Sequence, residues 1–90
     1  MYDKCIRVHV EGIVQGVFFR ASTKTEAENR NICGYAKNLL DGRVEVLACG
    51  QKESVDELVA WLHHGPEHSK VTRVHIEEVD LAAPEGFVVC

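Results

Sequence analysis

The chain has 90 residues, of which 46 % are apolar, and a formal net charge of −4 at pH 7. That length supports one hydrophobic core, so we expect a single domain over residues 1–90. The negative charge argues against nucleic acid as a partner, because a phosphate backbone demands a basic surface, and the lack of a long apolar run argues against a membrane span or secretory signal and favours a cytoplasmic protein.

The first predicted element is a strand over residues 5–11, where apolar and polar side chains alternate. Two glycines then break the alternation between Gly12 and Arg20. The chain turns helical from Ala21, and the capping-box spacing from Thr23 to Glu26 places a helix start there. We expect Asn31 to close this helix, because asparagine tolerates the left-handed conformation.

A hairpin follows, with strands over Tyr35–Leu40 and Arg43–Cys49 around the pair Asp41-Gly42. This dipeptide is typical of two-residue turns in which both positions have positive φ. A second capping box, from Ser54 to Glu57, predicts another helix. Its buried stripe would consist of four aliphatic residues, Val55, Leu58, Val59 and Leu62.

Gly65-Pro66 would end the second helix, and β-branched residues then predict a strand over Lys70–Val79. Residues 87–90 read as a short terminal strand. The order β-α-β-β-α-β plus a final strand predicts an α+β, ferredoxin-like (split βαβ) sandwich, with an antiparallel sheet and two helices on one face.

In that topology the first and third strands are antiparallel neighbours, and a register in which paired residue numbers sum to 54 suits both faces. It buries the apolar positions of both strands together. On the other face it places His9 opposite Glu45 and Glu11 opposite Arg43, which are complementary pairs.

The same register sets Cys5 opposite Cys49 at one end of the sheet. A disulfide between them is sterically possible, whereas a reducing cytosol opposes it, so the sequence leaves both states open. The four cysteines lack the spacing of a zinc site, and the five histidines fit surface positions better than ligand positions, so we expect no metal.

The segment Gly12-Ile13-Val14-Gln15-Gly16-Val17-Phe18-Phe19-Arg20 joins a strand to a helix. Such a connection can curl so that successive backbone N–H groups converge on an anion, helped by the positive end of the helix. Gly16 would allow close approach, and the guanidinium of Arg20 could hold two phosphate oxygens. The alternative is an ordinary turn beside a surface arginine, which glycine spacing alone favours.

The run from Gly12 to Arg20 resembles the acylphosphatase signature Gly-x-Val-Gln-Gly-Val-x-Phe-Arg, and residues 34–50 are similar to the second motif of that family. The resemblance implies a hydrolase that cleaves acyl phosphates to carboxylate and inorganic phosphate. It implies that Asn38 holds the attacking water and that Arg20 binds the phosphoryl group. The backbone amides that would assist Arg20 are those of Gln15, Gly16, Val17, Phe18 and Phe19.

The resemblance implies no cofactor and no partner beyond the small-molecule acyl phosphate and phosphate, and we expect a monomer. Two other functions remain to be weighed. A nucleic-acid binder of this fold would stack bases on aromatic residues of the central strands, which residues 6–11 and 43–49 lack. A regulatory or accessory module would retain phosphate affinity without turnover, whereas the presence of both Arg20 and Asn38 favours the enzyme.

Overall fold

A computed structural model describes residues 3–90 of the chain. Its strands and helices follow the predicted order. In chain order they are β1 (Lys4–Ile13), α1 (Phe19–Asn29), β2 (Cys33–Asn38), β3 (Val44–Gly50), α2 (Lys52–Leu62), β4 (Lys70–Glu78) and β5 (Phe87–Val89).

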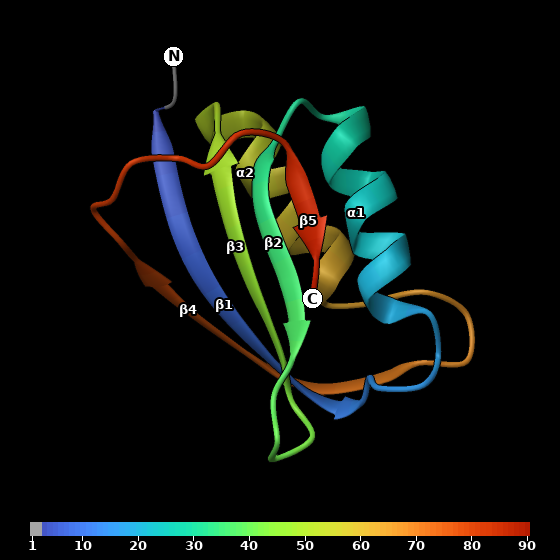
Figure 1. Cartoon of the computed structure of the whole chain (residues 1–90). Helices are drawn as coiled ribbons and strands as arrows, with labels where there is room; N and C mark the ends of the chain where they lie inside the picture. Colours follow the sequence, from blue (N-terminus) through green and yellow to red (C-terminus); the bar gives the residue numbers. More distant parts are fainter. Residues whose placement is uncertain (1–2) are drawn as a thin grey trace.

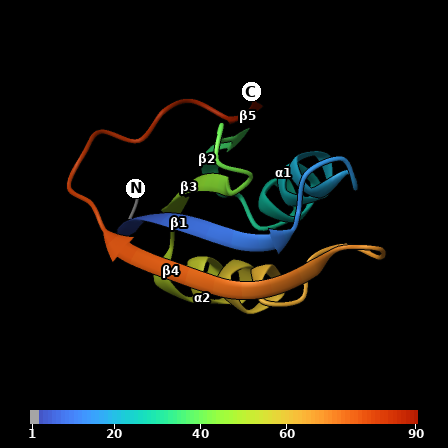
Figure 2. The ribbon, with the colours of Figure 1, turned by 90° about the horizontal axis from the view of Figure 1, so that it is seen from below.

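The strands form one sheet in the order β4-β1-β3-β2-β5. Figures 1 and 2 show α1 and α2 on the same side of this sheet. This arrangement confirms the ferredoxin-like α+β sandwich. The sheet is mixed, however, and not purely antiparallel, because β5 runs parallel to β2. Strands β4 and β5 lie at opposite edges of the sheet, and the segment between them crosses the end of the sheet to bring β5 beside β2 (Figure 1).

The core lies between the sheet and the helices. Alternate residues of β1 face inward and meet apolar residues of β3 in the predicted register, with Ile6 opposite Ala48 and Val8 opposite Val46. The helices cover this layer with fully buried side chains, which are Phe19 and Ala27 from α1 and Val55, Leu58 and Leu62 from α2. Burial of this apolar surface is the main force holding the helices on the sheet.

The two predicted polar pairs on the outer face have different outcomes. His9 Nε2 lies 2.8 Å from Glu45 Oε1, as expected. The pairing of β1 with β3 ends at Val10–Val44, so Glu11 instead lies opposite Arg73 of β4. Arg43 donates from Nε to Asp41 Oδ2 at 2.8 Å.

Both predicted helix starts are wrong. Helix α1 begins four residues before Thr23, with Phe18 as its N-cap, and the Thr23 hydroxyl donates to the Phe19 carbonyl inside the helix. Helix α2 begins at Lys52, so Ser54 lies in its first turn. A serine or threonine hydroxyl can bond to the preceding turn as well as cap a helix, and the packing of Phe19 extends α1 backward. The predicted end of α1 is right, since Asn31 has φ 57°.

The hairpin between β2 and β3 is longer than predicted. Gly42 has φ 97°, but Asp41 is not in the positive-φ region. The Leu39 amide donates to the Arg43 carbonyl, and the Gly42 amide donates to the Leu39 carbonyl, which makes a three-residue loop with glycine in the left-handed position. The Asp41 carboxylate accepts from the Arg43 amide, and this bond is the main cause that lowers its pKa.

Two further properties of the chain follow from the structure. Cys5 and Cys49 are joined in a disulfide that links β1 to β3. Among the described residues, the structure contains no helix with the length and apolar character required to cross a bilayer.

Candidate functional site

The candidate site begins with the connection from β1 to α1, residues 14–18, which we call the anion loop. Gly16 has φ 76° and Phe18 has φ 61°, so two alternate positions take the left-handed conformation. Backbone that alternates in this way curls, and curling brings successive amide groups to the same side. A Cβ on Gly16 would contact no atom within 4 Å, which shows that the loop is open at this point.

The amides of this loop and of the following helical turn have no acceptor within the chain. Across residues 15–21, all within the described region, no backbone N–H donates a hydrogen bond, and the first amide of the helix to do so belongs to Ser22. Four such groups, those of residues 18–21, belong to any helix start, but three more come from residues 15–17 of the loop. Together with the partial positive charge of the helix N-terminus they favour an anion.

The Gln15 side chain fastens the anion loop to the hairpin. Its Nε2 donates at 2.9 Å to the carbonyl oxygens of both Leu39 and Arg43. These residues close the loop that directly follows Asn38. The sequence prediction gave Gln15 a role only through its backbone. A glutamine beside a glycine is a weak signal, because the sequence alone does not show whether its side chain reaches a hairpin carbonyl or points into solvent.

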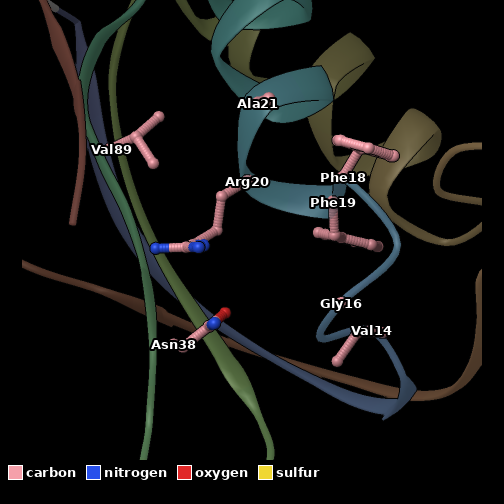
Figure 3. A pocket seen from close by; sticks show the side chains of 8 residues that line it. All are labelled: Val14, Gly16, Phe18, Phe19, Arg20, Ala21, Asn38 and Val89. Atoms are coloured by element: carbon pink, nitrogen blue, oxygen red, sulfur yellow. The ribbon is translucent and has the colours of Figure 1, made fainter.

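A hollow of about 260 Å³ opens between the anion loop, the first turn of α1 and the sheet, and we call it the Arg20 hollow. Figure 3 shows Arg20 reaching from α1 toward the sheet and Asn38 pointing toward it from the end of β2. The hollow is lined by Val14, Gly16, Phe18, Phe19, Arg20, Ala21, Asn38 and Val89.

The fold places Asn38 on this side of the sheet for a simple reason. Asn38 lies opposite Val44, and Ala36 lies opposite Val46, with both valines buried under the helices. Residues two apart on a strand share a face, so Asn38 follows Ala36 toward the helical layer. It lies beyond the part of the sheet that the helices cover, and it is therefore exposed to solvent at the hollow.

Strand β5 supplies two contacts that the sequence did not predict. Val89 lines the hollow, and the Cys90 carbonyl accepts a hydrogen bond from Arg20 Nη1. The parallel placement of β5 beside β2 carries these residues to Arg20. Since a short terminal strand can join either edge of a sheet, its sequence alone did not indicate this position.

The remaining predicted residues separate by what their side chains do. The ring of Phe18 is 83 % exposed and points away from Asn38 (Figure 3). The side chain of Val17 packs against the core. For both residues the sequence prediction concerned only the backbone amide. Among residues 3–90, no three His, Cys, Asp or Glu side chains gather in a way that could hold a metal ion.

Comparison with known proteins gives the family. The family model described as acylphosphatase matches residues 6–89 of the chain. The chain belongs to the acylphosphatase family. It is therefore an enzyme, a hydrolase of acyl phosphates. An acylphosphatase from Chromohalobacter salexigens is 48 % identical over 87 residues, which cover 97 % of each chain.

Solved structures agree with this assignment. An acylphosphatase from Coxiella burnetii superposes with a TM-score of 0.93 at 42 % identity, covering 97 % of this chain and 92 % of that one. The acylphosphatase from Bacillus subtilis superposes with a TM-score of 0.93 at 36 % identity, covering 100 % and 99 %. The likeness extends over the whole fold and is not limited to the two motifs.

Proposed function

We propose that the Arg20 hollow is the active site, in which Arg20 and the amides of residues 15–19 bind the phosphoryl group and Asn38 orients the attacking water. The observation that carries this proposal is the run of amides without acceptors beside a guanidinium. The chain is acidic overall, so an anion needs locally oriented donors to bind, and this segment offers them.

Arg20 stands on the second residue of α1, at the open end of the amide run. Its guanidinium can donate two parallel hydrogen bonds to phosphoryl oxygens, which a lysine ammonium does not do in the same plane. The bond from Nη1 to the Cys90 carbonyl fixes the direction of the side chain before substrate arrives. Prior orientation reduces the conformational entropy lost on binding.

Asn38 approaches the hollow from the sheet, across from Arg20 (Figure 3). A side-chain amide can accept a hydrogen bond from water through its oxygen and donate one through its nitrogen, so it can fix a water molecule in one orientation. Holding the water near the phosphorus atom converts an encounter in solution into a reaction within one complex. Asn38 therefore acts by positioning and does not remove the proton as a strong base would.

The chemistry suits a site without an acidic side chain. The leaving group is a carboxylate, whose conjugate acid has a pKa of about 4, so it departs without receiving a proton. Transfer of the phosphoryl group passes through a loose transition state with charge on its equatorial oxygens. Amides and a guanidinium aimed at those oxygens stabilise that charge, and this is the largest contribution the protein makes.

Hydrolysis of benzoyl phosphate, measured beside binding of inorganic phosphate, tests the division of roles. We expect Arg20→Ala to lower kcat/KM by about 10³-fold or more and to abolish phosphate binding. We expect Asn38→Ala to lower kcat by about 10²-fold and to leave phosphate binding nearly unchanged. If Asn38→Ala lost phosphate binding as well, the proposed division would be wrong.

Matched controls are available on the same chain. Arg73 is an exposed arginine on the opposite edge strand, β4, and Asn29 is an exposed asparagine at the last residue of α1. Arg73→Ala and Asn29→Ala should leave both measurements within about twofold of the wild type. A wild-type chain that bound phosphate but did not hydrolyse benzoyl phosphate would instead support the accessory-module alternative.

A further inference from the structure

Three cysteines lie side by side across three neighbouring strands. The register pairs Cys5 of β1 with Cys49 of β3, and Cys49 with Cys33 of β2. Directly opposed residues of antiparallel strands point to the same face, so all three sulfur atoms lie on the face away from the helices. Cys49 occupies the middle of this row, which we call the cysteine row.

The middle member is sheltered from solvent. Cys49 has no exposed surface, whereas Cys33 is half-buried. A thiol in solution therefore has no direct path to the Cys49 sulfur. A thiol on the neighbouring strand can reach the Cys49 sulfur without a path through solvent.

We propose that Cys33 is an exchanging thiol, which attacks the Cys5–Cys49 disulfide at Cys49 and forms a Cys33–Cys49 disulfide in its place. In this step the Cys33 thiolate forms a bond to Cys49 Sγ while the bond between Cys49 and Cys5 breaks. Cys5 leaves as the thiolate and takes up a proton equivalent to the one that Cys33 released. The number of disulfides is unchanged, so no oxidant or reductant is consumed.

The strand order supports the direction of attack. Since β3 lies between β1 and β2, Cys33 is on the opposite side of Cys49 from Cys5. Displacement at sulfur requires the incoming and leaving sulfur atoms to lie roughly in line, and a straight row of cross-strand neighbours provides that arrangement. Directly opposed antiparallel residues have Cα atoms about 4.5–5.5 Å apart, within the range that a disulfide spans.

The exchange moves the thiol from Cys33 to Cys5, which is also half-buried, at the other side of the row. Cys5 borders a surface hollow of about 310 Å³ between the start of β1 and the chain that follows β4. Its Sγ lies 4.0 Å from the carbonyl oxygen of Leu81, on the segment that crosses this end of the sheet. After exchange, a thiol at Cys5 would be open to small thiol and disulfide compounds.

Peptide mapping can test the exchange because trypsin separates the four cysteines. Cleavage after lysine and arginine places Cys5 in residues 5–7, Cys33 in residues 31–37, Cys49 in residues 44–52 and Cys90 in residues 74–90. Native protein carrying Cys90→Ser is held at about pH 8.5, where an ordinary thiol is half ionised, then quenched with acid and blocked with N-ethylmaleimide before digestion.

We expect linked peptides 31–37 and 44–52 in at least about 1 % of the molecules, beside the 5–7 and 44–52 pair. The further change Cys33→Ser should remove the new pair and leave the original one. If the native protein showed only the 5–7 and 44–52 pair throughout the incubation, the proposal would be overturned.

A second variant tests whether the alternative disulfide fits the folded sheet. Cys5→Ser, with Cys90→Ser, is placed in an oxidising glutathione buffer, with folding monitored by circular dichroism. We expect the 31–37 and 44–52 pair to form in the folded protein. If Cys33 and Cys49 instead stayed reduced or only glutathionylated, while the Cys33→Ser protein formed its disulfide in the same buffer, the row would not permit exchange.

Discussion

The side chain of Gln15 connects two parts of the candidate site that are far apart in the sequence. Its two hydrogen bonds hold the anion loop against the hairpin, and the hairpin begins directly after Asn38. In the proposed mechanism, the distance between the bound phosphoryl group and the oriented water therefore depends on a side chain that contacts neither of them. We propose that Gln15 is a positioning residue through its side chain, in addition to the phosphoryl contact proposed for its amide.

For Gln15→Ala we expect kcat to fall by about 10- to 100-fold with a smaller change in KM, because a misplaced water slows the reaction more than it weakens binding. The free energy of unfolding should fall by about 1–2 kcal/mol. Benzoyl phosphate kinetics and urea unfolding measure both effects.

The matched control is Gln51→Ala, an exposed glutamine at the N-cap of α2 whose side chain makes no capping bond. If Gln15→Ala and Gln51→Ala lost the same stability and Gln15→Ala left kcat unchanged, the hydrogen bonds from Gln15 to the hairpin would have no effect on the position of the water.

Phe18 shows why the shape of the anion loop was only partly predictable. An aromatic residue seldom has positive φ, and nothing in its neighbours' chemistry marks it as left-handed. Glycine at position 16 signalled a turn, and the motif signalled anion binding, but the curl depends on both residues. Such a backbone is imposed by the packing of Phe19 and Val17 on either side, which only the folded chain shows.

Among the elements, the outer face of the sheet carries a polar row in which Glu45 is central. Its carboxylate accepts from Tyr35 Oη at 2.6 Å and lies 2.8 Å from His9 Nε2 and 3.5 Å from Lys37 Nζ. Only 13 % of the side chain is exposed. Burial raises the pKa of Glu45, but the bonds from Tyr35 and His9 outweigh burial and hold the pKa below its ordinary value of 4.5.

The lowered pKa fixes the sign of an acid dependence. A carboxyl group that binds its proton less readily when folded stabilises the protein above pH 4.5, and this stabilisation is lost as the pH falls through the folded pKa. We expect Glu45→Gln to cost about 1–3 kcal/mol at pH 7 and to lose less stability than the wild type on further acidification. Urea unfolding at a series of pH values measures this.

Glu78→Gln is the control, since Glu78 is exposed on the edge strand β4. It should follow the wild-type curve closely. If the free energy of unfolding fell equally with pH in the wild type and in Glu45→Gln, the lowered pKa of Glu45 would not be the source of the acid dependence.

Strand register was predictable because many pairs of residues on two strands had to fit together. Helix starts were less predictable because each rested on one local pattern. The register of β1 against β3 followed from two faces that had to be satisfied together, and a slip of one residue would have exposed Ile6 and Val8. The helix starts depended on Thr23 and Ser54 alone. Each hydroxyl had two possible uses, and the packing of the helix decided between them.

For the whole molecule, the Cys5–Cys49 disulfide closes a covalent loop between residues that are 44 apart in sequence. A loop of that length restricts the unfolded chain, and the chain-entropy estimate of its stabilising effect is about 4 kcal/mol. We expect the urea midpoint to fall clearly when a reductant is added to the wild-type protein.

Cys49→Ala, which cannot form a disulfide with either neighbour, should unfold at the same urea concentration with and without reductant. If the urea midpoint of the wild type did not change with reductant, the disulfide would have little effect on the conformational entropy of the unfolded chain.

Strand β5 has a consequence for the order in which the enzyme becomes active during its synthesis. Although it has only three residues, it covers the outer edge of β2 and brings the Cys90 carbonyl to Arg20. A nascent chain that has reached only residue 86 already contains Arg20 and Asn38, but the hydrogen-bonding groups along one side of β2 are open to other strands. Residues 87–90 therefore complete the lining of the Arg20 hollow and, in the same step, cover the edge of β2 at which unfinished molecules would pair with one another.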